Sequence, residues 1–450
     1  MESKPTDITV TSASTEASVP SKLAAQRAKY GMLLDASGNE YVVPDYTLKQ
    51  IYDAIPKECF ERKVLTSLRY LFQDIALLTG TFLAFSTYNT SDYISSPIVR
   101  FALWGVYGFM QMIFGCGIWI LAHECGHMAF SQYKTLNDTI GLILHSSLLV
   151  PYFSWKITHK YHHRGVGNMA TDTAFTPHTR LSYAQSFNKT IEEIAELVED
   201  APIYAFTVAV IQQLFTWQLY TLTMMGVGET WFEKKAARDG VENPEKNEDG
   251  SLKRTYGLSG SLFNPYSPYF TELDAKLIWI NDAALLVVFS LLYYVGVTYG
   301  WGNLIVWYAM PYLLINACVI FIASLQHLDP SMPHYNADTW SFIRGAASTI
   351  DRDLGFIGHY FWHDANETHV LHHHIGSIPH YHAVKATEAI KPLMGKSYRK
   401  DESGMSNIMN TFRQTRRACQ WVESSTKSDG DGKGVLFYNS TDHIKHSYAL

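Results

Sequence analysis

The sequence predicts an all-α membrane protein, a polytopic bundle of four transmembrane helices with a histidine-rich helical cap on the cytosolic side. Three observations support this prediction. Apolar residues are gathered in blocks, and four blocks reach the roughly 20 residues that a helix needs to cross a bilayer. Lysine and arginine crowd the outer flanks of paired blocks but avoid the loops between partners, a bias that marks the cytosolic side. Eight histidines stand in three clusters beside the blocks.

The four expected spans fall into two pairs. A short loop without lysine or arginine before Arg100 separates the first two, and residues 299–302 form a tight hairpin between the last two. Both short loops are therefore expected in the lumen, with the histidine clusters and both termini in the cytosol. The spans are predicted at about residues 70–88, 101–122, 277–297 and 304–323.

A further apolar stretch, residues 203–225, is long enough to span but is predicted to be an interfacial helix. If the histidine clusters share one site, an even number of crossings must separate each cluster from the next. The tight hairpin already provides two crossings between the second and third clusters, so this stretch cannot add a third. Its Trp217, Tyr204 and Tyr220 suit an interfacial position.

Both ends of the chain are expected to lie outside the membrane domain, which is placed at residues 45–418. Residues 1–44 are rich in Ser, Thr, Ala and Lys and lack the apolar core of a signal peptide, so a disordered cytosolic tail is predicted. Residues 419–450 contain the turn SDGDGKG between two short extended runs, which predicts a hairpin and tail. The net charge of -6 gives no reason to expect nucleic acid binding.

The three histidine clusters have the spacing of metal ligands. In HECGH two histidines are four residues apart, while HKYHH and HVLHH each place three at i, i+3 and i+4, so on a helix each cluster presents one imidazole face. Imidazole binds iron, copper, zinc or nickel, and one metal rarely needs more than three or four protein ligands. The eight histidines therefore suggest two metals in one site; they are His123, His127, His159, His162, His163, His369, His372 and His373.

Two other interpretations stay open at this stage. HECGH also fits the HExxH pattern of a membrane zinc peptidase, in which Glu124 would activate a water, but this leaves the other two clusters without a role. A solvated histidine-rich surface would explain any one cluster. It does not explain two identical H-x-x-H-H spacings and an H-x-x-x-H on one membrane face.

An HxxxH box followed by two HxxHH boxes around paired spans resembles the membrane fatty acid desaturases and their hydroxylase relatives. HECGHMAFSQY, LQHLDPSMPHY, RGAASTIDRDLGF and ETHVLHHHIGSIPHYHA resemble most closely the endoplasmic-reticulum delta-12 (oleate) desaturases, from about residue 45 to the end. The resemblance implies a ninth ligand, His327, and two iron ions. Met128 departs from the group, which often has a further histidine there, and Ala323 stands where acyl-CoA desaturase relatives have a metal-approaching asparagine.

The resemblance also implies an activity. A delta-12 desaturase introduces a cis double bond into oleoyl chains to give linoleoyl chains, with O2 as co-substrate and electrons from cytochrome b5 and its reductase. The chain would act in the endoplasmic reticulum membrane on acyl groups carried by phospholipid or CoA. ETHVLHH favours delta-12 chemistry. An omega-3 desaturase, a hydroxylase or an acetylenase on the same scaffold, and a receptor that kept the scaffold, are the alternatives.

Two sets of residues are expected around the metals. Carboxylates and further histidines beside the boxes could line the cavity or orient ligand imidazoles, as neighbours of metal ligands often do; they are Glu124, His145, His363, Asp364 and Glu367. A basic face beside the second cluster could receive the electron donor, although a cap of positive charge at the cytosolic surface explains it equally well; its residues are Lys156, Lys160 and Arg164.

Overall fold

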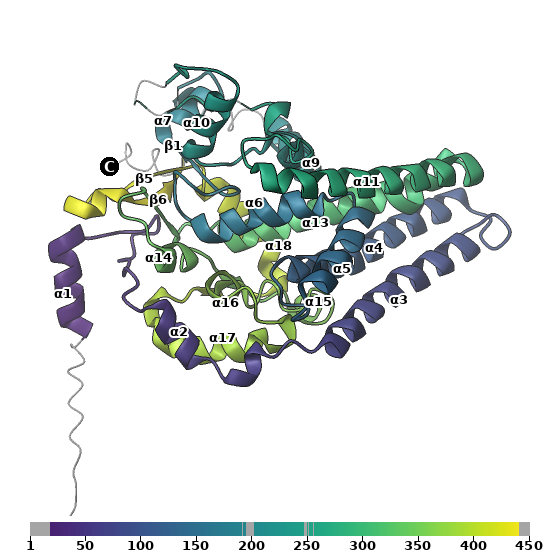
Figure 1. Ribbon diagram of the computed structural model, residues 1–450, viewed down its shortest axis with the longest axis horizontal. Helices are drawn as coiled ribbons and strands as arrows, with labels where there is room; N and C mark the ends of the chain where they lie inside the picture. Colours follow the sequence, from purple (N-terminus) through teal and green to yellow (C-terminus); the bar gives the residue numbers. More distant parts are fainter. Residues whose placement is uncertain are drawn as a thin grey trace, which may run out of the picture.

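The computed structural model describes residues 19–190, 192–194, 202–246, 250, 252–254 and 256–440. Most of them are helical, and Figure 1 shows long helices projecting from one side of a wider cap. Two short elements, α12 (Trp301–Leu304) and the π-helical η3 (Ile305–Ala309), lead into the last projecting helix. The projecting helices are α3 (Val64–Tyr88), α4 (Pro97–Gly126), α11 (Glu272–Tyr299) and α13 (Met310–His327).

Three helical stretches of the described chain are long and apolar enough to cross a membrane, namely α4, α11 and residues 301–327. A fourth would count if α5 (Lys134–Ser147) and α6 (Tyr152–Gly165), which meet at a bend of 106°, formed one broken span. The first predicted span lies within α3, which is not among the three because Gln73 and Asp74 interrupt its apolar run. Three of the four predicted spans therefore lie in helices that are long and apolar enough to cross a membrane.

The turn between α11 and α12 is as tight as the sequence predicts. Gly300 has φ 95°, a conformation that glycine adopts without steric cost. A Cβ on Gly296 would stand 2.7 Å from the Trp301 ring, so only a glycine lets the chain fold back so closely. The two apolar helices therefore leave this turn as a hairpin.

The helix α9 (Pro202–Thr223) forms over the stretch predicted to be interfacial. It packs against α13, where Gln213 Nε2 donates a hydrogen bond of 2.6 Å to the carbonyl of Ala317. Trp217 is buried, while Ile211 and Phe215 are exposed. The helix is present as predicted, and its position relative to the bilayer stays a prediction.

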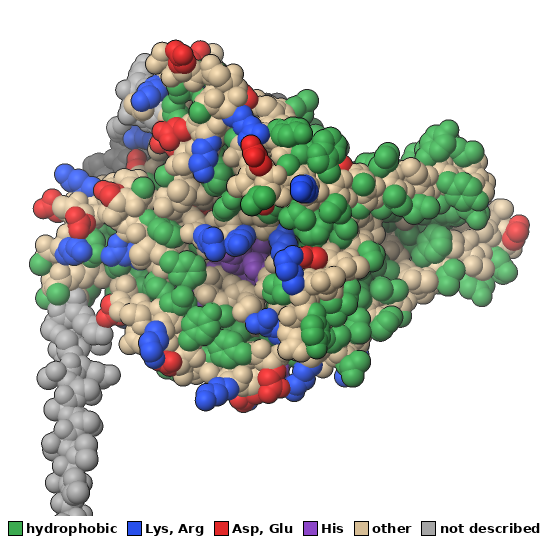
Figure 2. Space-filling model, viewed as in Figure 1, with side chains coloured by type: hydrophobic (Ala, Val, Ile, Leu, Met, Phe, Trp, Pro, Cys, Tyr) green, Lys and Arg blue, Asp and Glu red, His purple; other side chains and the backbone are tan. Residues whose placement is uncertain are grey.

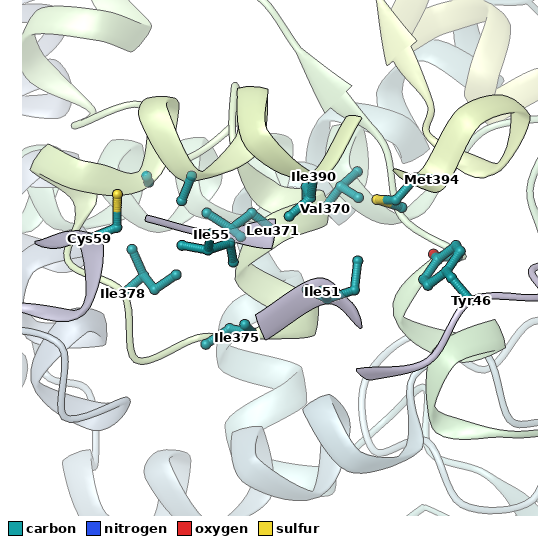
Figure 3. Packing of buried hydrophobic residues seen from close by; sticks show 13 residues of the cluster. Tyr46, Ile51, Ile55, Cys59, Val370, Leu371, Ile375, Ile378, Ile390 and Met394 are labelled. Carbon is teal, nitrogen blue, oxygen red and sulfur yellow. The ribbon is translucent and has the colours of Figure 1, made fainter. Parts of the chain in front are cut away.

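The cap surrounds one end of the projecting helices. Its largest buried cluster joins α2 (Leu48–Ala54), α16 (His369–His374) and α17 (His380–Met394). Figure 3 shows Ile55 of α2 close to Leu371 and Ile378. The other described helices are α1 (Val19–Tyr30), α7 (Arg180–Ser186), α10 (Glu229–Arg238), α14 (Phe342–Ala346), α15 (Gly355–Phe361) and α18 (Ile408–Ala418), with 3-10 turns η1 (Lys57–Phe60), η2 (Leu258–Gly260), η4 (Gly395–Ser397), η5 (Met405–Asn407) and η6 (Gly430–Gly434).

The all-α prediction needs one correction, because the cap also contains short strands. The larger sheet has the order β1-β5-β6-β2, in which β5 and β6 form an antiparallel hairpin, and β3 pairs with β4. The β5–β6 hairpin lies where the sequence predicts one, around SDGDGKG. The other strands, of two or three residues, bring distant segments together but leave no recognisable period in the sequence. They are β1 (His178–Thr179), β2 (Pro333–Tyr335), β3 (Asp351–Arg352), β4 (Lys400–Asp401), β5 (Trp421–Ser424) and β6 (Val435–Asn439).

Residues 19–44 do not behave as the predicted disordered tail. After α1 the chain packs against the C-terminal hairpin, where Leu33 and Tyr41 share a buried cluster with Val435 and Phe437. These few apolar side chains gain their burial from the C-terminal hairpin and from Tyr335, which lie hundreds of residues away, so local composition does not reveal it. The rest of the predicted tail, residues 1–18, and residues 441–450 lie outside the described residues.

Candidate metal centre

The predicted ligands come from four helical segments that end or run beside one another. His123 lies in the last turn of α4 and His127 caps it, while His327 is the last residue of α13. The remaining six are carried by α6 and α16, three on each. A Cβ on Gly126 would stand 2.7 Å from the Trp155 ring, so this glycine allows α4 and α6 to approach closely enough for their histidines to meet.

The nine histidines form two adjacent groups. In the outer group, one ring nitrogen from each member lies within 4.8 Å of the others, and its members are His123, His127, His159, His163 and His372. The inner group is buried. It contains His162, His327 and His373, whose ring nitrogens also lie within 4.8 Å of one another. We add His369 to this group because its Nε2 is 2.9 Å from Nε2 of His327. The groups touch where the rings of His163 and His373 stack, with centroids 4.1 Å apart.

The donor set fits bound metal ions. Nε2 of His123 is 2.8 Å from Nε2 of His159, and the latter is 3.1 Å from Nε2 of His163. Nε2 of His127 and of His372 are buried without a hydrogen-bond partner among the described residues, although buried polar atoms normally have one. Imidazole nitrogens that converge on one another in this way are accounted for by cations between them, and an all-nitrogen set suits iron, copper, zinc or nickel.

The surroundings of α16 keep its three ligand imidazoles neutral, which is the form that binds metals. Burial lowers the pKa of His372 to about 4. Burial, followed by repulsion from neighbouring imidazoles, holds the pKa of His369 and of His373 well below the ordinary value. These residues of α16 therefore present free lone pairs at physiological pH.

Asp172 is a candidate site residue that the sequence analysis missed. Its Oδ1 accepts a hydrogen bond of 2.7 Å from Nδ1 of His162, and both side chains are almost fully buried. The backbone amide of Ala174 also donates to Oδ1, at 3.0 Å, which fixes the carboxylate. A carboxylate on the far ring nitrogen orients a ligand histidine and makes it more basic. The only sequence signal was an aspartate shortly after the HKYHH box.

Glu124 is placed beside the site but is engaged elsewhere. Its Oε2 accepts from the backbone amide of His380 at 3.1 Å and pairs with Nδ1 of the same residue at 3.0 Å. The residue therefore anchors the start of α17 near the end of α4. The zinc-peptidase interpretation needs this oxygen for a water, so the geometry weighs against it.

The other neighbours predicted around the metals are engaged with residues other than the nine histidines. His363 Nε2 pairs with Asp74 of α3 at 2.8 Å, Asp364 pairs with His359, and Glu367 accepts from the amide of Leu354 at 2.8 Å. His145 is fully buried behind Trp119 and Trp155, with ring centroids 5.2 Å and 4.7 Å away. Of this set, His363 and Glu124 line the cavity described next.

A cavity of about 400 Å³ lies beside the histidines. Six of the nine line it, namely His123, His159, His162, His327, His369 and His372. From there it follows apolar walls between α4, α9 and α13, including Ile120, Trp217 and Val319. Polar residues such as His178 and Arg254 also line it. A long apolar chain could therefore lie in it with a methylene group next to the histidines.

The predicted basic face is partly neutralised. Lys156 Nζ lies 2.6 Å from Asp138 Oδ1, whereas Lys160 and Arg164 are exposed. Figure 2 shows histidine atoms in a hollow of the surface with Lys and Arg side chains beside it. Two of the three predicted residues thus keep their charge available to a partner.

Fold and site together define a membrane protein with a histidine-only candidate metal centre beside an apolar cavity. A family model described as fatty acid desaturase matches residues 99–402. An oleate hydroxylase of Claviceps purpurea is 42% identical over 436 residues, covering 96% of this chain and 89% of the relative. A delta-12 fatty acid desaturase of Mortierella isabellina is 38% identical over 391 residues, covering 85% and 90%. A delta-12 desaturase of Vernicia fordii is 35% identical over 397 residues, covering 88% and 92%.

The chain therefore belongs to the fatty acid desaturase family, and it is an oxidoreductase of lipid metabolism. The family prediction made from the histidine boxes is confirmed. The relatives include both desaturases and a hydroxylase, so membership alone leaves the particular reaction to be argued from the site.

Proposed function

We propose that this protein is an oxygen-dependent delta-12 fatty acid desaturase that converts oleoyl to linoleoyl chains at a di-iron centre. The observation that supports this most is the convergence of nine imidazoles from four segments beside an apolar cavity. Two irons held there would supply, with O2 and two external electrons, the oxidant that an unactivated methylene requires and that no side chain provides. The outer and inner groups would each hold one iron.

The residues of the chain have separate tasks in this proposal. The nine histidines bind the metals, and Asp172 fixes the ring of His162. Trp119 and Trp155 form the cavity wall beside His123 and His159, where they exclude water and limit the positions of the acyl chain. The apolar walls also favour binding of an extended acyl chain, since burial of each of its methylene groups contributes about 0.8 kcal/mol.

Electrons come from outside the chain in this proposal, from cytochrome b5 and its reductase. Lys160 and Arg164 follow the first histidine of the HKYHH box on the same helix, α6, so an acidic donor that docks on them would come close to the outer group. We place the site and both termini in the cytosol, with the spans in the endoplasmic reticulum membrane. The acyl carrier would be phospholipid or CoA.

Expression in yeast, which makes no polyunsaturated fatty acids, tests the activity. Wild-type protein should produce linoleate, and the purified enzyme should contain two irons per chain. His327→Ala should abolish linoleate, whereas His382→Ala, on α17 outside both groups, should keep it. Linoleate formation by iron-free protein would contradict the proposal.

Hydroxylation of oleate is the second candidate, and one observation favours it. The relative that matches the largest share of this chain among those compared above is an oleate hydroxylase. Both reactions begin with the same hydrogen abstraction. Desaturation then removes a second hydrogen from the neighbouring carbon, whereas hydroxylation transfers an oxygen atom to the carbon that lost the first. The same yeast extracts decide between them, because 12-hydroxyoleate and linoleate separate by gas chromatography and mass spectrometry.

A further inference from the structure

A second set of metal-binding side chains lies apart from the nine histidines, and we refer to it as the α15 cluster. It consists of Asp353 just before α15, His359 within it, and Asp364 and Glu367 just after it. One ligand atom each of Asp353, His359 and Glu367 lies within 4.8 Å of the others. Three residue types that bind transition metals therefore meet at one point of the cap.

His359 is already oriented as a metal ligand would be. Its Nδ1 pairs with Oδ1 of Asp364, and its Nε2 faces Asp353, whose Oδ1 is 3.6 Å away. A carboxylate on one ring nitrogen fixes the imidazole so that the other can coordinate. The Nε2 atom of His359 and the carboxylate of Asp353 thus point into the same space, and both side chains are about half exposed, at 51% and 41%.

Glu367 provides the independent sign that something binds here. The residue is 8% exposed, and its Oε1 accepts from the amide of Leu354 at 2.8 Å. Its other oxygen, Oε2, is buried without a hydrogen-bond partner among the described residues. A Cβ on Gly358 would lie 2.0 Å from Oε1 of Glu367, so only a glycine at position 358 leaves room for this carboxylate. An unpartnered buried carboxylate oxygen is costly and a cation would remove that cost.

We propose that the α15 cluster binds one divalent first-row transition cation through Asp353, His359 Nε2 and Glu367. Two carboxylates and one imidazole suit manganese, iron or zinc, whereas calcium prefers oxygen ligands alone. The cation would tie α15 to the loop that leads into α16, which carries three ligands of the main centre. The site therefore stabilises the segment that positions the third histidine box, and it does not depend on what the main centre holds.

Manganese uptake by the purified full-length protein tests the proposal. Mn2+ is the weakest of these metals for a given site, so it should leave a resident metal of the main centre in place. Free Mn2+ is counted by its electron paramagnetic resonance signal during titration, and all metals are counted by mass spectrometry. Wild type should bind one Mn2+ more than His359→Gln, and Asp353→Asn should weaken that binding at least tenfold.

Asp338→Asn is the matched control, because this exposed aspartate lies outside the cluster; it should bind Mn2+ as wild type does. Added Mn2+ should also raise the Tm of wild type and Asp338→Asn but not of His359→Gln. Equal Mn2+ uptake by wild type and His359→Gln, or none by wild type, would overturn the site. The second result would mean that the contacts of His359 with Asp353 and Asp364 hold the cluster together without a metal.

Discussion

A single hydrogen bond shows how much of the main centre depends on residues that are not ligands. His162 belongs to the inner group, where its Nε2 is 3.3 Å from Nε2 of His327. The opposite nitrogen is held by Asp172, which is itself fixed by backbone amides. The direction of the lone pair of His162 is therefore set from outside the metal site.

Asp172→Asn should weaken metal retention without unfolding the cap. The amide keeps the size of the side chain but removes the negative charge that makes His162 more basic, and loss of such a partner typically costs about 10–100-fold in metal affinity or activity. Metal content after dialysis against a chelator, together with product formation, measures the effect. Asp35→Asn serves as the control, because Asp35 lies in a turn outside both histidine groups and an amide oxygen can still accept from the backbone amides of Ser37 and Asn39. Full metal retention by Asp172→Asn would contradict the role of Asp172.

Asp351 gives the cap a defined pH dependence. Burial raises its pKa to about 7, although Tyr398 and the amide of Val370 donate to it. Because the folded-state pKa exceeds the unfolded value, the protonated form is favoured by folding. Its contribution to stability is complete below about pH 4 and is lost as the pH rises towards 7. The difference in Tm between wild type and Asp351→Asn should therefore decrease from pH 4 to pH 7; a constant difference would contradict the ionisation.

At the scale of elements, the contact of α5 with α6 places the second histidine box. The two helices meet at a 106° bend, and Gly141 of α5 faces the ring of Tyr152 at the start of α6. A Cβ on Gly141 would lie 2.3 Å from that ring, and Tyr152 is fully buried. The ring cannot move away without displacing the first turn of α6, and with it the register of the three histidines further along.

Gly141→Ala should therefore destabilise the protein by about 1–3 kcal/mol, the usual cost of overpacking a core. Gly80→Ala on α3 is the control, because a Cβ there meets nothing within 4 Å, and alanine is the better helix former. Thermal unfolding in detergent measures both. Equal Tm values for the two variants would show that α5 and α6 can separate freely.

At the scale of the whole molecule, the centre joins segments that are distant in sequence. His123, His162, His327 and His369 come from four different helices, so bound metals would link membrane helices to the cap. Without cations, several buried imidazole nitrogens have no partner among the described residues. Metal binding should for that reason contribute to folding as well as to chemistry.

Removal of metal by a chelator should abolish product formation and lower the Tm, and added Fe2+ should restore both. His159→Ala should reproduce the loss of activity while the protein still inserts into membranes, since the outer group would retain four members. Protease protection of microsomes measures insertion. A chelated protein with unchanged Tm and activity would show that the histidines are held together by something other than metal.

Much of the site could be predicted from the sequence because histidine spacing on a helix fixes which imidazoles share a face. The eight box histidines and the ninth, His327, all lie in the two groups. Asp172, His380 and Asp74 could not be found in the same way. Each meets its partner across a tertiary contact, and a lone aspartate or histidine in a sequence carries no period that reveals it.

The sequence alone determined the mainly helical class with apolar helices long enough to cross a membrane, the tight turn at Gly300 between two of them, and which histidines share a helix face, because these depend on local apolar length and on residue type. Only the tertiary structure decided that α1 and its following segment pack on the C-terminal hairpin, that short strands join the cap, and which carboxylates meet which histidines. Most of these features depend on contacts between segments far apart in the sequence. Even His162 and Asp172, which are ten residues apart, meet through a turn that leaves no period in the local sequence.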